Sequence, residues 1–351
     1  MALKQLGSVL QEALHREAKN YRRYEMPISR RLWLYRQQFT SSRNEIYEFS
    51  RHDVDDFLTD LQNVRARGLN DPNTDALRNT TLFSLTVSRN FPEVVPDILG
   101  VLTGDGDVVP YPGGGRETVE DIIEAARSGP LVVKPVRNSG GEDVHLIEPD
   151  ETGFLFDGQA VTEAELTEII GSVGRSVVQE RVQQASYART IYPDVANTIR
   201  VLTMVDPESK EPFIAAVAHR FGASSTGNVD NWSSGGLSAR IDPETGTLGE
   251  AVVSTYADSS GRKDHHPDTG ARLVGEQIPS WGRVRDKLLE IAGTYRGLWT
   301  YVGWDLILED DGGNFALIEG NDWPDIRVHQ AHEPLLADDR VRRFYEHHDV
   351  L

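Results

Sequence analysis

The sequence predicts a mixed α/β fold of the α+β type, preceded by a helical N-terminal extension. Residues 3–70 look helical, with Leu6, Leu10 and Leu14 recurring at four-residue spacing. Farther along, short apolar runs bounded by glycine, proline and aspartate alternate with amphipathic stretches, which is typical of strands between helices. A chain of 351 residues is long enough for two or three modules with a substantial core.

Composition narrows the class of protein. The chain is 38% hydrophobic and 26% charged, has no run of about 18 apolar residues, and begins without the apolar core of a signal peptide. We therefore expect no membrane span and a cytoplasmic location. Cysteine is absent, which excludes disulfides, thiol nucleophiles and zinc–thiolate sites together.

The charge balance argues against nucleic-acid binding. The net charge is −19, so the chain lacks the basic field that attracts phosphate backbones. Of its 36 basic residues only six are lysines, and an acidic, lysine-poor surface suits a halophilic, high-salt cytoplasm. Arginine richness can equally reflect genome composition. Because lysines are so few, a lysine between an apolar strand and a glycine loop is a candidate for function.

Apolar periodicity and bounding residues predict the elements of the first half. The stretch Asp53–Arg65 is an amphipathic helix candidate. The arginine pairs at 22–23 and 30–31 belong to solvated helix faces or, alternatively, bind an acidic substrate or partner. Further helices are expected at 73–90, 117–126 and 162–171, and strands at 94–102, 131–133, 145–147 and 176–182.

The second half is predicted to contain more strands. Residues 197–205 and 213–221 alternate well enough to be paired antiparallel strands around a turn. The remaining elements are a strand at 237–241, a long amphipathic helix at 281–298, and two strands at 301–308 and 315–319 joined by an acidic turn.

One segment of the first half has the features of a phosphate site. Leu131–Val133 is a buried-strand pattern that delivers Lys134 into Pro135, whose ring ends regular pairing. The next loop offers backbone N–H groups with little side-chain bulk, at Ser139, Gly140 and Gly141. A lysine charge and such amide donors can lie over a polyphosphate. The spacing is not that of a P-loop, and a surface hairpin with a Gly-Gly turn fits the same residues.

The last two predicted strands carry the most informative chemistry. Asp305 interrupts a strand otherwise built for burial, and Glu319 and Asn321 end the next strand on the same side. If the strands are antiparallel neighbours, the two carboxylates approach and repel each other. Two carboxylates and an amide carbonyl suit Mg²⁺ (or Mn²⁺) carrying substrate phosphates. The alternative is a hydrogen-bonded strand end with one carboxylate facing water.

Taken in order, these segments resemble the ATP-grasp superfamily. The resemblance covers roughly residues 76–335 and is nearest to the sugar-transfer-associated branch, which is related to α-L-glutamate ligases. It is carried by Lys134 before its loop, Gln179-Glu180-Arg181-Val182, Asn197-Thr198-Ile199-Arg200-Val201, the stretches 230–237 and 266–270, Gly303-Trp304-Asp305, and Glu319 with Asn321.

The resemblance implies an ATP-grasp fold and an ATP- and Mg-dependent ligase that joins a carboxylate to an amine or hydroxyl. The carboxylate attacks the γ-phosphate of ATP, and a nucleophile then displaces the acylphosphate. Lys134 would hold the α- and β-phosphates, and Arg200 would stabilise the transferring phosphoryl group. Asp305, Glu319 and Asn321 would bind the metal. The hinge that would hold adenine consists of Gln179, Glu180, Arg181 and Val182.

Other residues are candidates for the substrates. Arg220 could bind the triphosphate or the carboxylate, with an ordinary ion pair as the alternative. The glycine-rich loop 228–236 either is a simple turn or binds substrate through Asn231, Ser233 and Ser234. Arg327 lies just past the metal end and could face substrate. His266 is expected to be a hydrogen-bonded loop histidine rather than a base.

The sequence departs from the family pattern at two places. Many relatives carry a lysine in the helix where this chain has Thr80 and Thr81, so a phosphate contact is missing unless Arg78 replaces it. Trp304 stands where several ATP-grasp ligases place an arginine near the acid, so Arg200 would have to serve.

We predict four parts: a helical extension, an N-terminal α/β part, a lid, and a C-terminal part with the metal, at residues 1–75, 76–130, 131–185 and 186–351. The expected substrates are a small carboxylate and an amine or sugar-linked acceptor, in cell-surface glycan or other polysaccharide synthesis. Two alternatives stay open: a kinase on the same scaffold, and a nucleotide-binding regulator without turnover. The sequence does not indicate an oligomeric state.

Overall fold

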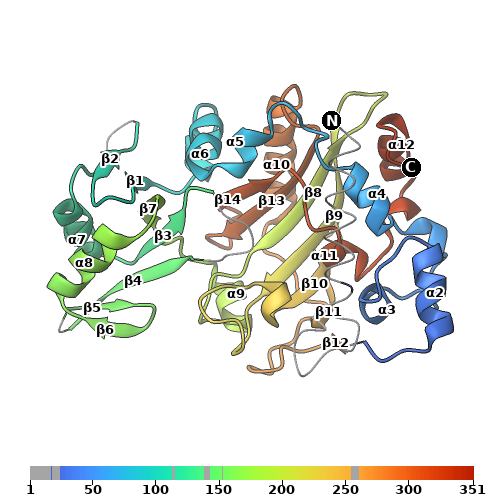
Figure 1. The fold of residues 1–351 in the computed structure, drawn as a ribbon, viewed down its shortest axis with the longest axis horizontal. Helices are drawn as coiled ribbons and strands as arrows, with labels where there is room; N and C mark the ends of the chain where they lie inside the picture. Colours follow the sequence, from blue (N-terminus) through green and yellow to red (C-terminus); the bar gives the residue numbers. More distant parts are fainter. Residues whose placement is uncertain (1–16, 18–23, 113–114, 138–142, 152, 254–260) are drawn as a thin grey trace.

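Two antiparallel sheets of seven strands each organise the protein, and they lie next to each other in Figure 1. The computed structural model describes residues 17, 24–112, 115–137, 143–151, 153–253 and 261–351. The predicted mixed α+β class is confirmed. No helix in these ranges combines the length and the apolar character that crossing a membrane requires.

The first sheet is built before residue 181, in the strand order β2-β1-β7-β3-β4-β5-β6. The helices α7 (Val119–Ser128) and α8 (Glu163–Ser172) each begin with a capping box, at Thr118 and Thr162, and pack into this sheet's core. The strands are β1 (Ile98–Leu102), β2 (Val108–Pro110), β3 (Leu131–Pro135), β4 (His145–Asp150), β5 (Gly153–Phe156), β6 (Gln159–Val161) and β7 (Ser176–Glu180).

Alternation along β3 sends its side chains into two environments. Leu131 and Val133 are buried in the core that α7 and α8 complete. Val132 and Lys134 therefore lie on the opposite face, where they line a cleft. Pro135 ends the strand, as predicted. The observed strand is two residues longer than expected, so that it includes the lysine.

The second sheet has the order β12-β11-β10-β9-β8-β13-β14. The two antiparallel pairs predicted from the sequence, β8 with β9 and β13 with β14, are both present. The long helix α10 (Trp281–Tyr295) packs on one face. The strands are β8 (Ile199–Val205), β9 (Pro212–Phe221), β10 (Leu237–Ile241), β11 (Leu248–Val253), β12 (Gly261–Lys263), β13 (Tyr301–Leu308) and β14 (Phe315–Asn321).

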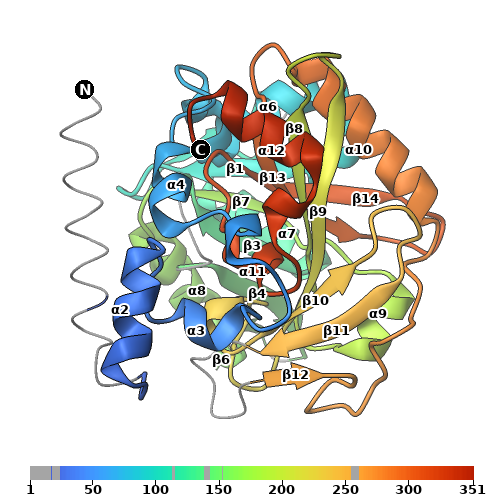
Figure 2. The same ribbon diagram turned by 90° about the vertical axis from the view of Figure 1, so that its right-hand side faces the viewer.

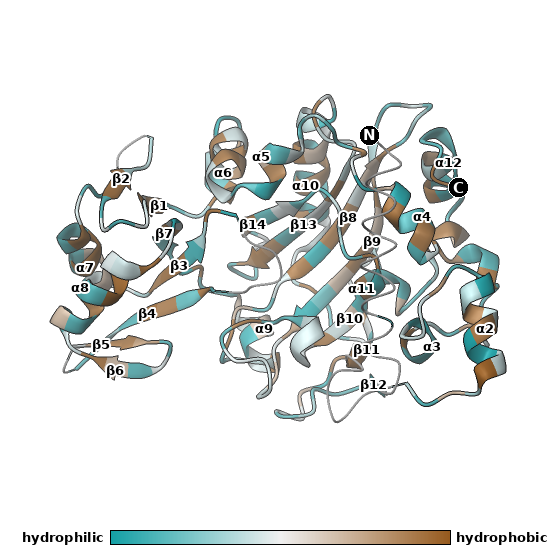
Figure 3. Cartoon of the chain, viewed as in Figure 1, coloured by the Kyte–Doolittle hydropathy of each residue, from teal (hydrophilic) through white to brown (hydrophobic). Residues whose placement is uncertain are grey.

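The strands of the second sheet separate an apolar face from one that carries charge. Val201 of β8 and Trp304 and Leu306 of β13 lie in the core beside α10. Arg200 and Asp305 alternate with these residues and emerge on the other face, where the strand register pairs them directly. Brown and teal bands along β8 show the hydrophobic and hydrophilic residues in Figure 3.

The N-terminal extension is less helical than predicted. The single helix expected at 53–65 is wrong, because Leu58 donates its backbone N–H to Gln330 Oε1 (2.7 Å) and Thr59 forms a capping box that starts a new helix. The residues Leu6, Leu10 and Leu14 lie outside the described ranges. The described elements are α2 (Ile28–Arg36), α3 (Arg43–Ile46), the 3₁₀ turn η1 (Val54–Asp56) and α4 (Asp60–Arg65). In Figures 1 and 2, α2 lies at the outer edge of the molecule and α4 lies beside α12.

The helix predicted at residues 73–90 is divided in two. The helices α5 (Thr74–Arg78) and α6 (Thr80–Ser88) meet at Asn79, which has an extended backbone and accepts a hydrogen bond from Leu82 N. The strand expected at 94–102 begins only at Ile98. Pro92–Val94 forms the 3₁₀ turn η2, and Pro96 has no N–H for a ladder.

Other elements complete the fold. The helices predicted at 117–126, 162–171 and 281–298 are confirmed with shifted ends, as α7, α8 and α10. The sequence did not predict β2, β5, β6, β11 and β12, nor α9 (Ser186–Ile191), α11 (Arg327–Gln330), α12 (Asp339–His347), η3 (Trp232–Ser234) and η4 (Leu335–Ala337). The four-part division of the chain stays a prediction, and β1 and β2 share their sheet with β3 and β4 across its boundary at residue 130.

Candidate active site

A cleft of about 610 Å³ lies between the two sheets. Glu180 and Ser234 are exposed and are not among its lining residues. Ser139, Gly140 and Gly141 lie outside the part of the chain that the structure describes. The other predicted site residues all line the cleft: Lys134, Gln179, Arg181, Val182, Arg200, Arg220, Asn231, Ser233, Asp305, Glu319, Asn321 and Arg327.

A β-bulge at Ile318 brings the two predicted metal-binding carboxylates together. Asp305 pairs with Glu319, but the next residue, Leu306, pairs with Leu317, so Ile318 is the extra residue of β14. Leu317 belongs to the core beside α10, and without the bulge Glu319 would point the same way. The bulge therefore turns Glu319 and Asn321 to the cleft face, which also holds Asp305.

Charged side chains of alternating sign cross this face of the second sheet. We call Asp230, Arg220, Asp305, Arg200 and Glu319 the charge ladder. Arg200 forks onto Asp305 with its Nε and Nη2 groups, and its Nη2 lies 3.7 Å from Glu319 Oε1. Arg220 Nη2 lies 3.0 Å from Asp305 Oδ2 and 3.4 Å from Asp230 Oδ1. Each arginine of the ladder thus lies between two carboxylates.

Asp305 is the buried centre of the ladder. Burial alone would raise the pKa of its carboxyl group, but the charges of Arg200 and Arg220 outweigh burial and hold that pKa well below its usual value. The pairing also keeps Arg200 charged, since its own pKa is raised although burial opposes this. Several ATP-grasp ligases have an arginine at the position of Trp304. In this chain Arg200 can take that place, because it reaches Asp305 from β8.

Glu319 is the open end of the ladder. Its side chain is 43% exposed. Burial of its carboxyl group raises the pKa of Glu319, and the neighbouring Asp305 carboxylate raises it further. A carboxyl group in this position gains from a cation. The opposite shifts at Asp305 and Glu319 show that the two arginines neutralise the inner carboxylate more fully than the outer one.

The donors at this end fit a magnesium ion. Asn321 Nδ2 lies 3.2 Å from both Glu319 Oε1 and Gly303 O. Among the described residues, no group of three or more His, Cys, Asp or Glu side chains could hold a metal ion. The available donors are the carboxylates of Asp305 and Glu319 and the amide of Asn321. Three oxygen donors of this kind leave other positions on the ion for phosphate oxygens. Asp305 would have to share its oxygens with the arginines.

Lys134 reaches this site from the first sheet. Its Nζ donates to the carbonyl oxygen of the bulge residue Ile318 (3.3 Å), one residue before Glu319. Burial lowers the pKa of Lys134 to about 8, and the charge of Glu319 opposes that shift. A polyphosphate in the cleft would therefore meet Lys134 on one side and the Glu319 end of the ladder on the other.

The predicted adenine hinge lies at the end of β7, where the backbone N–H groups of Glu180, Arg181 and Val182 follow one another. The N–H groups of Glu180 and Arg181 are used by Asp97 O and Pro130 O. The N–H of Val182 has no backbone acceptor among the described residues, and Val182 lines the cleft. The Arg181 side chain pairs with Glu148 (2.9 Å). Backbone contact with a base is thus open at Val182, whereas the Glu180 side chain points elsewhere.

The sequence did not single out Asp230 and Thr198, which hold Arg220. Asp230 Oδ2 accepts from both the backbone N–H and the hydroxyl of Thr198, and Arg220 Nε and Nη2 in turn lie 2.9 and 2.6 Å from that hydroxyl oxygen. Burial raises the pKa of Asp230, and Arg220 opposes this. Asp230 lies within the predicted loop 228–236, but one aspartate among 55 acidic residues gave no separate signal.

The loop 228–236 presents only part of its predicted donor set to the cleft. Asn231 caps the turn η3 by accepting from Ser233 N (3.0 Å). The Ser233 side chain is exposed at the cleft wall, while Ser234 lies outside it. Arg327, on the facing wall, forks onto Asp325 (2.6 and 2.5 Å). Asp325 and Trp323 also line the cleft and were not predicted.

The histidines near the site are buried structural groups. His266 donates its Nε2–H to Gly222 O (2.8 Å) and stacks on Tyr192, which agrees with the expected loop histidine. His219 contacts the hydroxyl of Tyr187 (2.6 Å), and burial lowers its pKa to about 3. His329, on α11, is buried without a hydrogen-bond partner for either ring nitrogen among the described residues, and burial lowers its pKa to about 3 as well.

Arg78 does not supply the missing phosphate contact in this structure. Its guanidinium forks onto Asp322 (2.9 and 2.6 Å), and it is not among the residues that line the cleft. Thr80 lines the cleft in the region where relatives carry a lysine. Lys134 is therefore the lysine that reaches the described cleft wall.

Comparison with protein families gives a match over most of the chain. The family model described as sugar-transfer associated ATP-grasp matches residues 87–340. A search of curated proteins gives no match.

A comparison with solved structures gives matches to several ligases. A D-alanine–D-alanine ligase from Helicobacter pylori is 11% identical, with coverage of 77% of this chain and 61% of that chain and a TM-score of 0.43. The corresponding enzyme from Bacillus anthracis is 12% identical, with coverage of 78% and 69% and a TM-score of 0.41. The ATP-grasp ligase PsnB with its minimal precursor is 16% identical, with coverage of 75% and 58% and a TM-score of 0.39, so this chain spans less than two thirds of its length.

Proposed function

The chain belongs to the sugar-transfer-associated ATP-grasp family, and from that membership we propose that it is an ATP- and Mg-dependent ligase. It joins a carboxylate to an amine or hydroxyl acceptor through an acylphosphate. One observation carries the proposal: Lys134 of the first sheet and Glu319 of the second line one cleft, with the lysine Nζ 3.3 Å from the carbonyl oxygen of Ile318.

Lys134 and the arginines of the charge ladder act on the phosphates. A γ-phosphoryl group develops and redistributes negative charge as a substrate carboxylate oxygen attacks its phosphorus and ADP leaves. Arg200 stays protonated at any working pH, and its carboxylate neighbours fix its planar fork in place. Arg220, fixed by Thr198 and Asp230, is the second group that can reach this charge. These contacts preorganise the site instead of forming during the reaction.

Glu319 and Asn321, with Asp305 sharing its oxygens, are the residues that would hold the metal. A bound Mg²⁺ would supply positive charge against the negative charge that develops on the phosphoryl group. The raised pKa of Glu319 supports this role, because a carboxyl group beside a second carboxylate is stabilised in its ionised form when a cation arrives.

The cleft walls at the other end would hold the substrates. The first sheet covers the phosphate end, which helps to keep water away from an acylphosphate. Ser233, Asn231 and Arg327 face the end beyond the charge ladder, where the carboxylate and the acceptor would meet. The nucleophile of the acceptor attacks the acyl carbon and phosphate leaves. The family description mentions sugar transfer, and we extend the proposal to a sugar-linked acceptor and a cytoplasmic, high-salt setting.

The experiment that tests this function is a screen for ADP release. The purified chain is incubated with ATP and Mg²⁺ in high salt against amino acids and sugar acids, with amine and sugar acceptors. The proposal predicts ADP release that depends on a carboxylate, together with an amide or ester product. A phosphorylated product without condensation would instead identify a kinase, and no carboxylate-dependent ADP release would contradict the proposal.

A further inference from the structure

The segment that directly follows the metal end forms one rim of the cleft. We call residues 322–330 the rim segment; its cleft-lining members are Trp323, Asp325, Arg327 and Val328. It contains only the short helix α11. A segment with so little regular structure depends on outside contacts to keep its side chains in place.

The first half of the rim segment is attached to residues of the N-terminal part of the chain. Arg78 forks onto Asp322 at 2.9 and 2.6 Å. Trp323 donates its indole N–H to the backbone oxygen of Asn63 (2.8 Å), and the Arg67 guanidinium lies 5.0 Å from the Trp323 ring centroid. The cleft-facing indole therefore has its orientation set from α4 and the turn after it.

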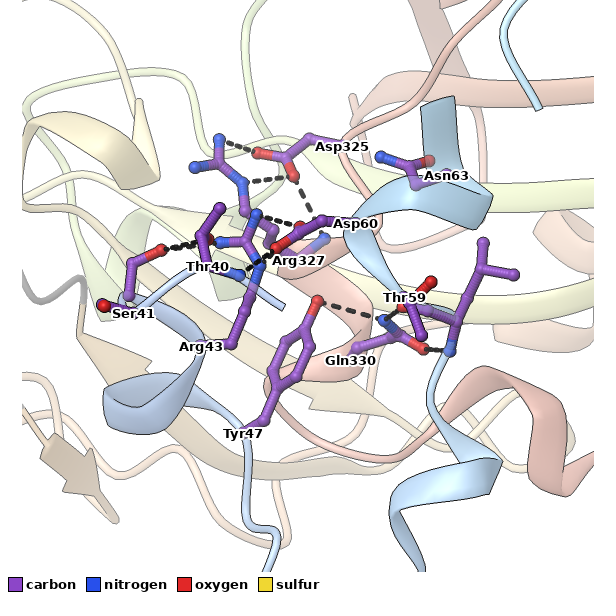
Figure 4. A network of polar contacts seen from close by, with 12 residues as sticks. Thr40, Ser41, Arg43, Tyr47, Thr59, Asp60, Asn63, Asp325, Arg327 and Gln330 are labelled. Atoms are coloured by element: carbon purple, nitrogen blue, oxygen red, sulfur yellow. Dashed lines mark hydrogen bonds and ion pairs between the residues drawn. The ribbon is translucent and has the colours of Figure 1, made fainter. Parts of the chain in front are cut away.

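The end of the rim segment is attached more tightly. Gln330 is buried, and its amide exchanges two hydrogen bonds with the backbone of Leu58: Oε1 accepts from Leu58 N (2.7 Å), and Nε2 donates to Leu58 O (3.0 Å). Gln330 Nε2 also donates to the hydroxyl of Tyr47 (3.0 Å). Figure 4 shows this amide beside Tyr47 and Thr59. Satisfied buried amides of this kind fix one arrangement of the backbone.

A second ion pair, Arg43 with Asp60, lies beside the charged pair of the rim segment, Asp325 with Arg327. Arg43 forks onto Asp60 (2.9 and 2.5 Å), whose other oxygen accepts from Thr40 N (2.7 Å). Figure 4 places this pair next to Asp325 and Arg327. Burial would raise the pKa of Asp325, but the charges of Arg327 and then Arg43 hold it below its usual value. Asp325 therefore remains a carboxylate that can orient Arg327.

All of these supporting residues precede residue 87, where the family match begins. We propose that the segment 40–78 is part of the active site: it braces the rim segment, and Arg43 is a positioning residue that acts through Asp325 to present Arg327 to the carboxylate of the substrate. A guanidinium in a fixed plane is suited to bidentate contact with a carboxylate. This inference rests on the proposed ligase function, because that function supplies the carboxylate substrate.

The test compares three variants of the full chain with the wild type. Arg43→Met removes the fork and the charge while keeping an unbranched side chain, and Arg43→Lys restores the charge alone. Arg340→Met is the control, since Arg340 also pairs with an aspartate through two nitrogens, Asp338, but lies outside the cleft and outside the rim segment. Hydrogen exchange of peptides across 322–332 is measured first, and Mg·ADP binding second. The third readout is KM and kcat for the carboxylate that the ADP-release screen identifies.

If segment 40–78 holds the rim segment in place, Arg43→Met should change the rim segment and carboxylate binding but not nucleotide binding. Exchange in the rim segment rises by about tenfold, which corresponds to about 1.4 kcal/mol of local opening. Mg·ADP affinity stays within about twofold, and KM for the carboxylate rises by about tenfold with little change in kcat. Arg43→Lys recovers part of the KM, and Arg340→Met changes none of these readouts.

Two results would overturn the inference. Unchanged exchange in the rim segment of Arg43→Met would show that Arg43 braces nothing. A loss of Mg·ADP affinity parallel to the rise in KM would show general damage rather than positioning. If the wild type turns over no carboxylate, the proposed function fails, while the exchange measurement still decides whether the brace exists.

Discussion

Asp305 and Glu319 are paired across neighbouring strands, yet their carboxyl groups have opposite pKa shifts. Arg200 and Arg220 lower the pKa of Asp305 against the effect of burial, whereas burial and the Asp305 charge raise that of Glu319. Asp305 therefore contributes stability that is present above its unfolded pKa and is lost as the pH falls through the lower folded value. Glu319 shows the reverse: its ionised form costs stability once the pH rises above its unfolded pKa.

The first prediction separates the two proposed roles of the carboxylates: Glu319 mainly binds the metal, whereas Asp305 also holds the two buried arginines. Glu319→Gln should abolish Mg-dependent ADP release while leaving the melting temperature unchanged or raised, because it removes an unfavourable charge. Asp305→Asn should lower the free energy of unfolding by about 3–5 kcal/mol, because it leaves two buried arginines without their shared partner. Thermal unfolding and ADP release, measured on the same preparations at pH 7, check both parts.

Asp311→Asn is a control for this comparison, since Asp311 lies in the acidic turn and bonds Ser186 at an exposed position. It should alter neither activity nor melting temperature appreciably. If Glu319→Gln keeps Mg-dependent activity, the assignment of the metal site is wrong.

The second prediction concerns the charge of Lys134. Its pKa is lowered by burial to about 8, and binding of a polyphosphate favours its protonated form. Above that pH the free protein must take up a proton on binding, so affinity for Mg·ADP should fall by up to about tenfold per pH unit. Calorimetric titrations between pH 7 and 9.5, in buffers of different ionisation enthalpy, would detect both the slope and the proton uptake.

Lys134→Met should bind Mg·ADP weakly and without this slope. It should also raise the melting temperature slightly, because a lysine with a lowered pKa costs stability at neutral pH. Lys287→Met is the control variant, because Lys287 lies on α10 outside the cleft and pairs with Glu93 at the surface. It should keep the wild-type dependence of Mg·ADP affinity on pH. An equal slope in Lys134→Met would mean that another group titrates.

At the residue scale, the sequence predicted those site residues whose charge contrasts with the apolar residues next to them in the chain. Lys134 stands out after an apolar strand, and Asp305 stands out inside one. Asp230 opens a stretch that carries the family resemblance, but no role was predicted for it, because its partner Arg220 comes close only in the folded chain. Asp325 was not predicted either, although its partner Arg327 lies two positions away. The exposure of Glu180 could not be predicted either, since it depends on where β7 ends.

The hairpin of β13 and β14 is the element that sets the geometry of the site. The bulge at Ile318 changes which residues face the cleft, and it also leaves the Ile318 carbonyl available to Lys134. Gly320, between Glu319 and Asn321, lies on the other side, against α5 and α6. A Cβ atom at Gly320 would lie 2.6 Å from Leu77 Cδ2 and 2.9 Å from Phe83 Cε2.

The third prediction follows from that close approach. Gly320→Ala should lower the free energy of unfolding by about 1–3 kcal/mol, because Leu77 and Phe83 are buried and must shift. The shift should also displace Glu319 and weaken Mg·ADP binding. Gly282→Ala is the control: no atom lies within 4 Å of its added Cβ, so this helix position should gain about 0.4–1 kcal/mol. Urea unfolding gives both values, and equal stability of the two variants would contradict the packing argument.

At the element scale, the sequence predicted strands and helices whose periodicity is set by their own core. The antiparallel pairs β8–β9 and β13–β14 and the helix α10 are of this kind. The helix predicted at 53–65 failed because Leu58 gives its N–H to Gln330, which lies 272 positions away in the chain. The bulge could not be predicted, because Phe315–Ile318 are all apolar and show no alternation that would fix the register.

The whole molecule places a lysine from one sheet opposite carboxylates from another. The helices α7 and α8 cover one face of the first sheet and α10 covers one face of the second. The opposite faces line the cleft, although part of that face of the second sheet is covered by an apolar cluster with α12. The N-terminal segment 40–78 contacts the rim segment of that cleft and does not itself line the cleft. The family resemblance predicted that Lys134 lies opposite Glu319 and Asn321. The contacts between segment 40–78 and the rim segment had no sequence signal, because each of them joins residues more than 200 positions apart.

The measurement that most directly tests this arrangement is a crystal structure of the full chain with a non-hydrolysable ATP analogue and Mn²⁺ in place of Mg²⁺. We predict an anomalous peak coordinated by Glu319 and Asn321, with phosphate oxygens on its far side and Lys134 Nζ within hydrogen-bonding distance of the same triphosphate. A nucleotide bound outside the cleft, or a metal that contacts neither Glu319 nor Asn321, would contradict the account.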